Sequence, residues 1–199
     1  MVARKHDTTN DAPALALRGG PGASQSGTHR RLLVRPVLEH PHPLLARPSV
    51  EVNPTAPAIV GLANLLVATL RSSPACVGLA APQIGENVRL FAMDVSGHPQ
   101  ARSCAGLVVL ANPRILARRE SAVVRERCAS VPRVLGDVPR ATEVMVSGFV
   151  PGSGKNIVLT TDGIEASCIQ HEIDHLDGML FVDRVVDPVT DLFIDERHA

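Results

Sequence analysis

Tryptophan and tyrosine are absent from the 199-residue sequence, and phenylalanine occurs only four times. A chain with so few large aromatic rings lacks the side chains on which single-stranded nucleic acids stack. An excess of charge is also absent, because Lys+Arg and Asp+Glu both number 20. This balance gives no direct signal for binding to nucleic acid or to a membrane surface. The core must therefore be built mainly from Val, Leu, Ile and Ala.

Long hydrophobic runs are missing as well. Residues 53–70 carry no charge but include two prolines, and they fall short of the ~20 strongly apolar residues of a membrane span. We interpret them as a buried helix. Near the start of the chain, the only apolar patch is residues 12–17, which contains Pro13 and is too short for a secretory signal. We therefore expect a cytoplasmic protein without a membrane segment.

Cysteine is scarce and scattered, at positions 76, 104, 128 and 168. Disulfides are not expected in a cytoplasmic chain. At least one of these cysteines is instead a candidate metal ligand or nucleophile.

Composition divides the chain into three parts. Residues 1–30 are rich in Gly, Ser, Thr, Ala and Pro, which predicts a disordered N-terminal extension. Residues 31–187 carry the patterned sequence and are expected to form one domain. Residues 188–199 are expected to be a C-terminal tail.

Apolar spacing predicts a helix from Thr55, with Thr55 as its cap and Pro57 in its first turn. Residues 76–85 are small and contain glycine, so we expect a loop or a tight strand there. A hairpin turn is predicted at residues 151–154. Short strands are predicted at residues 88–94, 107–111, 121–126, 143–150 and 157–161. These elements predict an α+β fold of antiparallel strands around two helices.

The most informative stretch is Gln170–Leu176, which contains His-Glu-x-x-His. On a helix, His171 and His175 lie on one face, where two imidazoles suit a divalent metal, and Glu172 beside them suits a base for water. Asp162 and Glu165 form a capping-box pattern at the start of this helix. Gly178 offers a stop. The alternative is a polar helix with two unrelated histidines.

A hydrolytic zinc-type centre needs three protein ligands, and the helix supplies two. A thiolate can be the third. The segment Glu126–Pro132 makes Cys128 the most suggestive choice, but spacing alone does not exclude Cys76, Cys104 or Cys168. For each of these three, a small buried hydrophobic side chain is the alternative interpretation.

Three motifs in this order resemble those of the peptide deformylase family. Cys76–Gln83 is similar to Gly-x-Gly-x-Ala-Ala-x-Gln, Glu126–Ser130 to Glu-Gly-Cys-Leu-Ser, and Gln170–Gly178 matches Gln-His-Glu-x-Asp-His-Leu-x-Gly in full. The resemblance covers about residues 32–186. It implies antiparallel sheets packed around a central helix that carries the His-Glu-x-x-His motif. It also implies that residues 31–187 are a catalytic domain.

The resemblance further implies an activity and a ligand set. The expected reaction is removal of the formyl group from N-formyl-methionyl nascent chains, which releases formate. Association with the ribosome is compatible with this substrate but does not follow from it. Cys128, His171 and His175 would bind one divalent metal, Fe²⁺ in most members, with Zn²⁺, Ni²⁺ or Co²⁺ as substitutes.

The expected catalytic residues also follow from the resemblance. Glu172 would move the proton, and Gln83 and the backbone N–H of Ala129 would stabilise the oxyanion. Gly78 would let the backbone approach the substrate. The direct chemical groups are all present in this sequence.

Four positions depart from the family pattern. Cys76 and Arg127 stand where glycine is usual, Ala129 where leucine is usual, and Ser167 where arginine is usual. We expect Arg127 to narrow the cleft or change its charge, and Ala129 to remove part of the wall of the methionine pocket.

Two alternatives to an active deformylase stay open at this point. A degenerate homologue would keep the metal and fold but act as a binding protein. An endopeptidase of the zincin kind would need a third ligand downstream of the helix, where only His198 is found.

Overall fold

The computed structural model describes residues 34–73, 76–102 and 104–196. The predicted disorder of residues 1–30 therefore lies outside the described residues. The elements are η1 (Pro43–Ala46), α1 (Pro57–Arg71), β1 (Gly78–Ala80), η2 (Ala81–Ile84), β2 (Leu90–Met93), β3 (Val108–Arg119), β4 (Ala122–Cys128), β5 (Val131–Arg140), β6 (Glu143–Phe149), β7 (Asn156–Asp162), α2 (Gly163–Leu176), η3 (Phe181–Asp183) and β8 (Leu192–Ile194).

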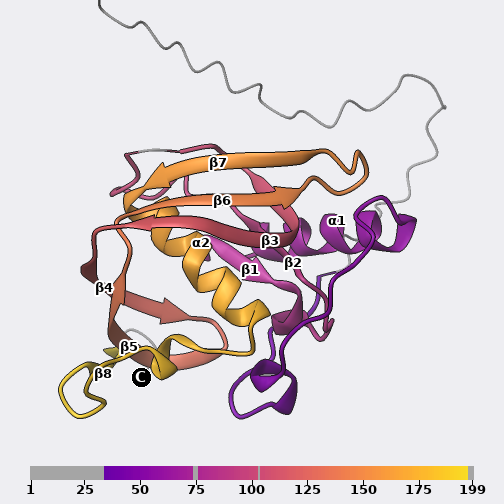
Figure 1. Cartoon of the computed structure of the whole chain (residues 1–199). Helices are drawn as coiled ribbons and strands as arrows, with labels where there is room; N and C mark the ends of the chain where they lie inside the picture. Colours follow the sequence, from indigo (N-terminus) through magenta and orange to yellow (C-terminus); the bar gives the residue numbers. More distant parts are fainter. Residues whose placement is uncertain (1–33, 74–75, 103, 197–199) are drawn as a thin grey trace, which may run out of the picture. The chain divides into compact units, whose positions relative to one another are not determined.

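The strands form two antiparallel sheets, and the predicted α+β class is confirmed (Figure 1). One sheet has five strands in the order β1-β2-β3-β6-β7, and the other has three in the order β4-β5-β8. In the described part of the chain, no helix is long and apolar enough to cross a membrane.

Strand β2 has apolar side chains on both of its faces. Leu90 and Ala92 belong to a cluster with the buried side chains of α1, whereas Phe91 and Met93 belong to a cluster with those of α2. Successive side chains of a strand point to opposite faces. The strand is therefore covered by a helix on each face, and both faces must be apolar.

Helix α2 is the central helix. Its apolar residues Ala166, Ile169, Ile173 and Leu176 pack in the cluster that includes the five-stranded sheet. From the β4–β5 hairpin, Cys128 contacts His175 near the end of the same helix. The helix lies between the sheets, as Figure 1 shows, and is 14 residues long. It therefore presents its polar motif to residues brought in by the smaller sheet.

Asp162 occupies the predicted N-cap position of α2, but the predicted capping box is not formed, and the cap predicted for α1 is wrong. No side-chain cap is formed by Asp162, and Glu165 instead accepts hydrogen bonds from Ala105 N (2.7 Å) and Thr161 Oγ1 (2.6 Å). For α1 the N-cap residue is Ala56, while Thr55 Oγ1 donates to Asn53 Oδ1. Other hydrogen-bond partners, two of them local and one, Ala105, distant in sequence, thus take the side chains that the pattern assigned to the helix ends.

Two predicted features of chain reversal are confirmed. Strands β6 and β7 pair antiparallel from Glu143↔Asp162 to Phe149↔Asn156, with the predicted 151–154 turn between them. Helix α2 ends at Leu176, and Gly178 follows with a φ of 76°, which glycine adopts at low cost.

Strand β3 is longer than predicted, because it runs through Asn112-Pro113 to Arg119 instead of ending at Ala111. Its pairing with β6 shifts register between Ala111 and Arg114, so the proline lies at a bulge. Asn112 has a φ of 49°, and its side-chain amide bonds both Val52 N and Val52 O. These two hydrogen bonds stabilise the left-handed backbone conformation of Asn112, which would otherwise end the strand.

Candidate functional site

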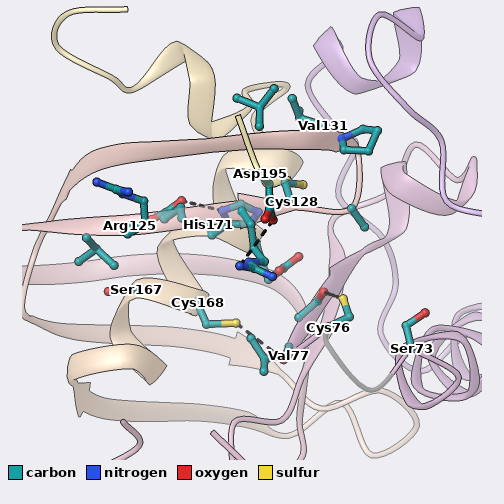
Figure 2. Close-up of a pocket in the computed structure, with 18 of the residues that line it drawn as sticks. Ser73, Cys76, Val77, Arg125, Cys128, Val131, Ser167, Cys168, His171 and Asp195 are labelled. Atoms are coloured by element: carbon teal, nitrogen blue, oxygen red, sulfur yellow. Dashed lines mark hydrogen bonds and ion pairs between the residues drawn. The ribbon is translucent and has the colours of Figure 1, made fainter. Parts of the chain in front are cut away.

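A cavity of about 630 Å³ lies beside α2 and the β4–β5 hairpin, and Figure 2 shows part of its lining. Six of the seven candidate residues line it: Gly78, Gln83, Cys128, Ala129, His171 and Glu172. The seventh, His175, is 1% exposed, and its Nε2 lies 3.2 Å from Cys128 Sγ. The structure therefore brings together residues that are almost 100 positions apart in the chain.

Three candidate ligands converge at the wall of this cavity. The sulfur of Cys128 and one ring nitrogen each of His171 and His175 lie within 4.8 Å of one another, the one such cluster found in the described residues. The two rings stand edge to face, with centroids 4.9 Å apart, as expected for positions i and i+4 of a helix. Cysteine 128 reaches them because it ends β4 beside the last turns of α2.

The histidine orientation depends on a buried carboxylate. The Nδ1 of His171 lies 2.8 Å from Glu126 Oε2, which leaves Nε2 to face the cysteine. Arg140 in turn donates to both oxygens of Glu126 and to Asp174. Burial opposes ionisation of Glu126, but the hydrogen bonds from Arg140 and His171 outweigh it and lower its pKa to about 2. A charged acceptor thus holds the ring.

Cysteine 128 is placed to be a thiolate. Burial disfavours its charge, but the positive charge and hydrogen bond of His175, together with those of His171, hold its pKa well below the usual value. A thiolate with two imidazoles is a donor set that suits Zn²⁺, Fe²⁺, Co²⁺ or Ni²⁺. The residues present therefore fit a divalent transition metal, and this fit rests on their convergence and burial.

Glu172 is a buried acid beside this group, 2% exposed. Burial raises its pKa to about 7, although the charges of His171 and His175 act in the opposite direction. Its Oε2 has no hydrogen-bond partner among the described residues. An acid with a pKa near neutrality and a free oxygen can both accept and return a proton.

Gly78 makes room for this carboxylate. A Cβ atom on Gly78 would overlap Oε1 of Glu172 and come within 2.8 Å of the Cys168 sulfur. The glycine on β1 is thus required by a close approach of side chains from α2. The sequence pattern had suggested close approach of the backbone to a substrate at this position.

Gln83 is oriented by its own turn. Its Oε1 accepts from Ala80 N at 2.8 Å, so its Nε2 faces the cavity and donates to Ser130 Oγ at 3.1 Å. Ala129 lies between the paired residues Cys128 and Val131, in the short turn that joins β4 to β5. The side-chain amide of Gln83 therefore lies near the Cys128 sulfur, and the backbone N–H of Ala129 belongs to the turn that follows Cys128.

The four unusual residues all line the cavity. The thiol of Cys76 donates to Gly78 O at 2.8 Å, and burial followed by the charge of Glu172 raises its pKa to about 12. Arg127 reaches Asp195, and Ser167 bonds back to Gly163 O within α2. Ser167 also lines a second cavity of about 870 Å³.

Other residues of the site were not predicted. Glu126 could have been found from its place two residues before Cys128, since alternate residues of a strand share a face. Arg140 and Asp195 carry no such local signal, because their roles depend on how β5 pairs with β4 and how β8 pairs with β5. Cys104, one of the alternative ligands, is exposed, and His198 lies outside the described residues.

The family model, the similar sequences and the similar structures all point to one protein family. The family model described as polypeptide deformylase matches residues 34–190. Peptide deformylase 2 of Xanthomonas campestris is 39% identical over 151 residues, which cover 74% of this chain and 85% of the relative. A crystal structure of a peptide deformylase from Legionella pneumophila has a TM-score of 0.71 at 34% identity, covering 79% of this chain and 88% of that one.

A further solved structure is informative about ligands. It is the Met-Ala-Ser bound crystal structure of a class I type b peptide deformylase from Acinetobacter baumannii, with a TM-score of 0.69 and 29% identity. The match covers 77% of this chain and 99% of that one.

Proposed function

The chain belongs to the polypeptide deformylase family, and we propose that the residues gathered in the cavity carry out its reaction. The activity is metal-dependent hydrolysis of the N-formyl group of newly synthesised polypeptides, which releases formate. The observation that supports these residue roles best is the convergence of Cys128, His171 and His175 beside a buried Glu172 whose pKa is about 7.

Cys128, His171 and His175 are the proposed ligands of one divalent cation. When bound, such a cation acts as a Lewis acid toward the formyl oxygen and makes a water more acidic. We propose Fe²⁺ as the native ion, with Zn²⁺, Ni²⁺ or Co²⁺ as substitutes. The resemblance of the three motifs to the family supports iron, and the thiolate–imidazole donor set is compatible with all four ions.

Glu172 is the proposed proton carrier. Its free Oε2 takes a proton from the attacking water while the water oxygen bonds to the formyl carbon. The same carboxyl then gives the proton to the amine nitrogen as the carbon–nitrogen bond breaks. Formate and a free N-terminal amine result, so the atoms and protons balance. A pKa near 7 suits both directions of transfer at neutral pH.

Gln83 and Ala129 are the proposed oxyanion donors. The Nε2 of Gln83 is already held toward the cysteine, because its Oε1 is engaged by Ala80 N. The N–H of Ala129 belongs to the turn beside Cys128. Each preorganised donor of this kind contributes roughly 10²–10³ to a hydrolysis rate. Gly78 supports the reaction indirectly, by leaving space for Glu172.

An extended peptide is the proposed form of the substrate. Strands β1 and β4 each end their sheet, and both contribute residues to the cavity. Open strand edges accept an added strand through main-chain hydrogen bonds. The tripeptide Met-Ala-Ser bound to the Acinetobacter relative supports this length and chemistry. We propose nascent chains in the cytoplasm as the source of the substrate. Association with the ribosome would bring the enzyme to these chains.

The decisive experiment measures formate release from formyl-Met-Ala-Ser by protein loaded anaerobically with Fe²⁺. We expect Glu172→Gln to keep its metal but lose roughly 10²–10⁴ of the rate. Glu39→Gln is the matched control, because Glu39 is exposed and lies outside the cavity. An active Glu172→Gln variant would contradict the assigned role. Absence of formate with metal-loaded wild-type protein would contradict the activity. That result is the one expected for a degenerate homologue, which binds metal without hydrolysing the substrate.

A further inference from the structure

We propose that Arg125, Arg127 and Arg133 form a basic rim that favours substrates with an acidic residue directly after the formyl-methionine. All three arginines line the same cavity as Cys128 and His171. This inference rests on the proposed function, since it concerns the choice among formylated peptides at that site.

The rim has an excess of positive charge. Arg125 pairs with Asp137, and Arg127 lies 3.6 Å from Asp195. Arg133 is exposed and forms no ion pair within the part of the chain that is described. The three arginines have two carboxylate partners, so the rim keeps a net charge of one positive unit. The side chain of Arg127 is still 40% exposed, so its guanidinium can meet a further carboxylate.

Strand alternation places this charge opposite the substrate's second side chain. On β4, Glu126 and Cys128 are buried, whereas Arg125 and Arg127 are exposed. A peptide added to the edge of β4 alternates in the same way, and its side chains pair with those of the same face. If the first side chain enters the cavity with Cys128, the second lies on the face of Arg127.

The C-terminal strand holds Arg127 in this position. Strand β8 pairs with β5 through Val134↔Ile194, and Asp195 N continues the ladder by donating to Arg133 O at 2.8 Å. Asp195 is thereby fixed, with a side chain only 6% exposed, at the wall of the cavity (Figure 2). Asp195 is a positioning residue in this proposal, and Arg127 is the residue that contacts the substrate.

The test compares kcat/KM for formyl-Met-Glu-Ser with that for formyl-Met-Lys-Ser at low ionic strength. For wild-type protein we expect a ratio of roughly two to five in favour of the acidic peptide, the size of an exposed ion pair. The ratio should fall toward one in Arg127→Gln, persist in Arg127→Lys, and shrink as salt is added. Arg114→Gln is the control, because Arg114 is exposed and does not line the cavity.

The Asp195→Asn variant tests the positioning role. Removing its charge frees Arg127 from a neutralising partner, so the acidic preference should rise, mainly through KM. A melting curve of the same variant shows whether it is folded, and Arg127→Gln carries the test if it is not. Equal rates on both peptides in wild-type protein would overturn the rim while leaving the deformylase activity standing. Formate from neither peptide would instead contradict the proposed function.

Discussion

At the residue scale, Gly78 determines whether the proton carrier fits. We expect Gly78→Ala to lower kcat by roughly 10², because the added Cβ would overlap the Glu172 carboxylate and push it from the cavity. Gly97→Ala is the control, since a Cβ there meets nothing within 4 Å. Steady-state formate release checks both variants. If Gly78→Ala keeps wild-type kcat, Glu172 does not need its present position.

The cysteines should differ in reactivity. Burial and the charge of Glu172 raise the pKa of Cys76 to about 12, so at pH 8 almost all of it stays a thiol, which is the unreactive form. Cys104 is exposed. We therefore expect iodoacetamide to modify Cys104 far faster than Cys76, as followed by peptide mass spectrometry. Rapid modification of Cys76 would mean that the cavity wall opens in solution.

Single residues could be predicted from the sequence where one motif specifies several of them at a fixed spacing. The i, i+4 spacing placed His171 and His175 on one face of a helix. Cysteine 128 was selected by the resemblance, because spacing left four cysteines open. The caps failed for a physical reason. Glu165 sits at the right spacing for a capping box, but Thr161 and Ala105 compete for its oxygens.

At the element scale, strand existence was predicted better than strand ends. Strand β5 was missed, because Pro132, Gly136 and Pro139 argue against a strand. The structure accommodates them, since β8 pairs only with residues 134–136 of β5 and the two prolines lie where β5 has one neighbour. Strand β8 itself, within the predicted tail, has three residues and gives no pattern. Pairing of this kind is decided by tertiary contacts.

Strand β5 also delivers Arg140, which joins Glu126 of β4 to Asp174 of α2. We expect Arg140→Gln to lower stability by about 3 kcal/mol, because Glu126 and Asp174 lose the buried arginine that they share and keep only His171 and Arg184, respectively. Metal affinity should fall roughly 10–100-fold, since Glu126 no longer fixes His171. Urea denaturation and competition with a coloured chelator measure the two effects.

Arg118→Gln is the matched control for that prediction, because Arg118 lies on β3 and is exposed. It should leave both quantities unchanged. A folded Arg140→Gln variant with wild-type metal affinity would show that the ring of His171 is held by other contacts.

At the scale of the whole domain, the proposed metal joins the two sheets through α2. The proposed ligands come from the end of β4 and from α2, which packs on the five-stranded sheet. The fold class could be predicted from this helix and the alternating strands. The order of strands could not, because it depends on contacts such as Arg127–Asp195 between segments about 70 residues apart.

Removing the metal should therefore destabilise the domain. An ion present at about 1,000 times its Kd stabilises the folded state by about 4 kcal/mol. For a chain of this size, that corresponds to a fall in Tm of roughly 8–16 °C on chelation. Cys128→Ala should have a lowered Tm that a chelator no longer changes. Cys104→Ala, which alters an exposed thiol, should behave as the wild type does. Calorimetry with parallel metal analysis tests this, because a wild-type Tm that stays constant while its metal content falls to zero would mean that the two sheets are held together by packing alone.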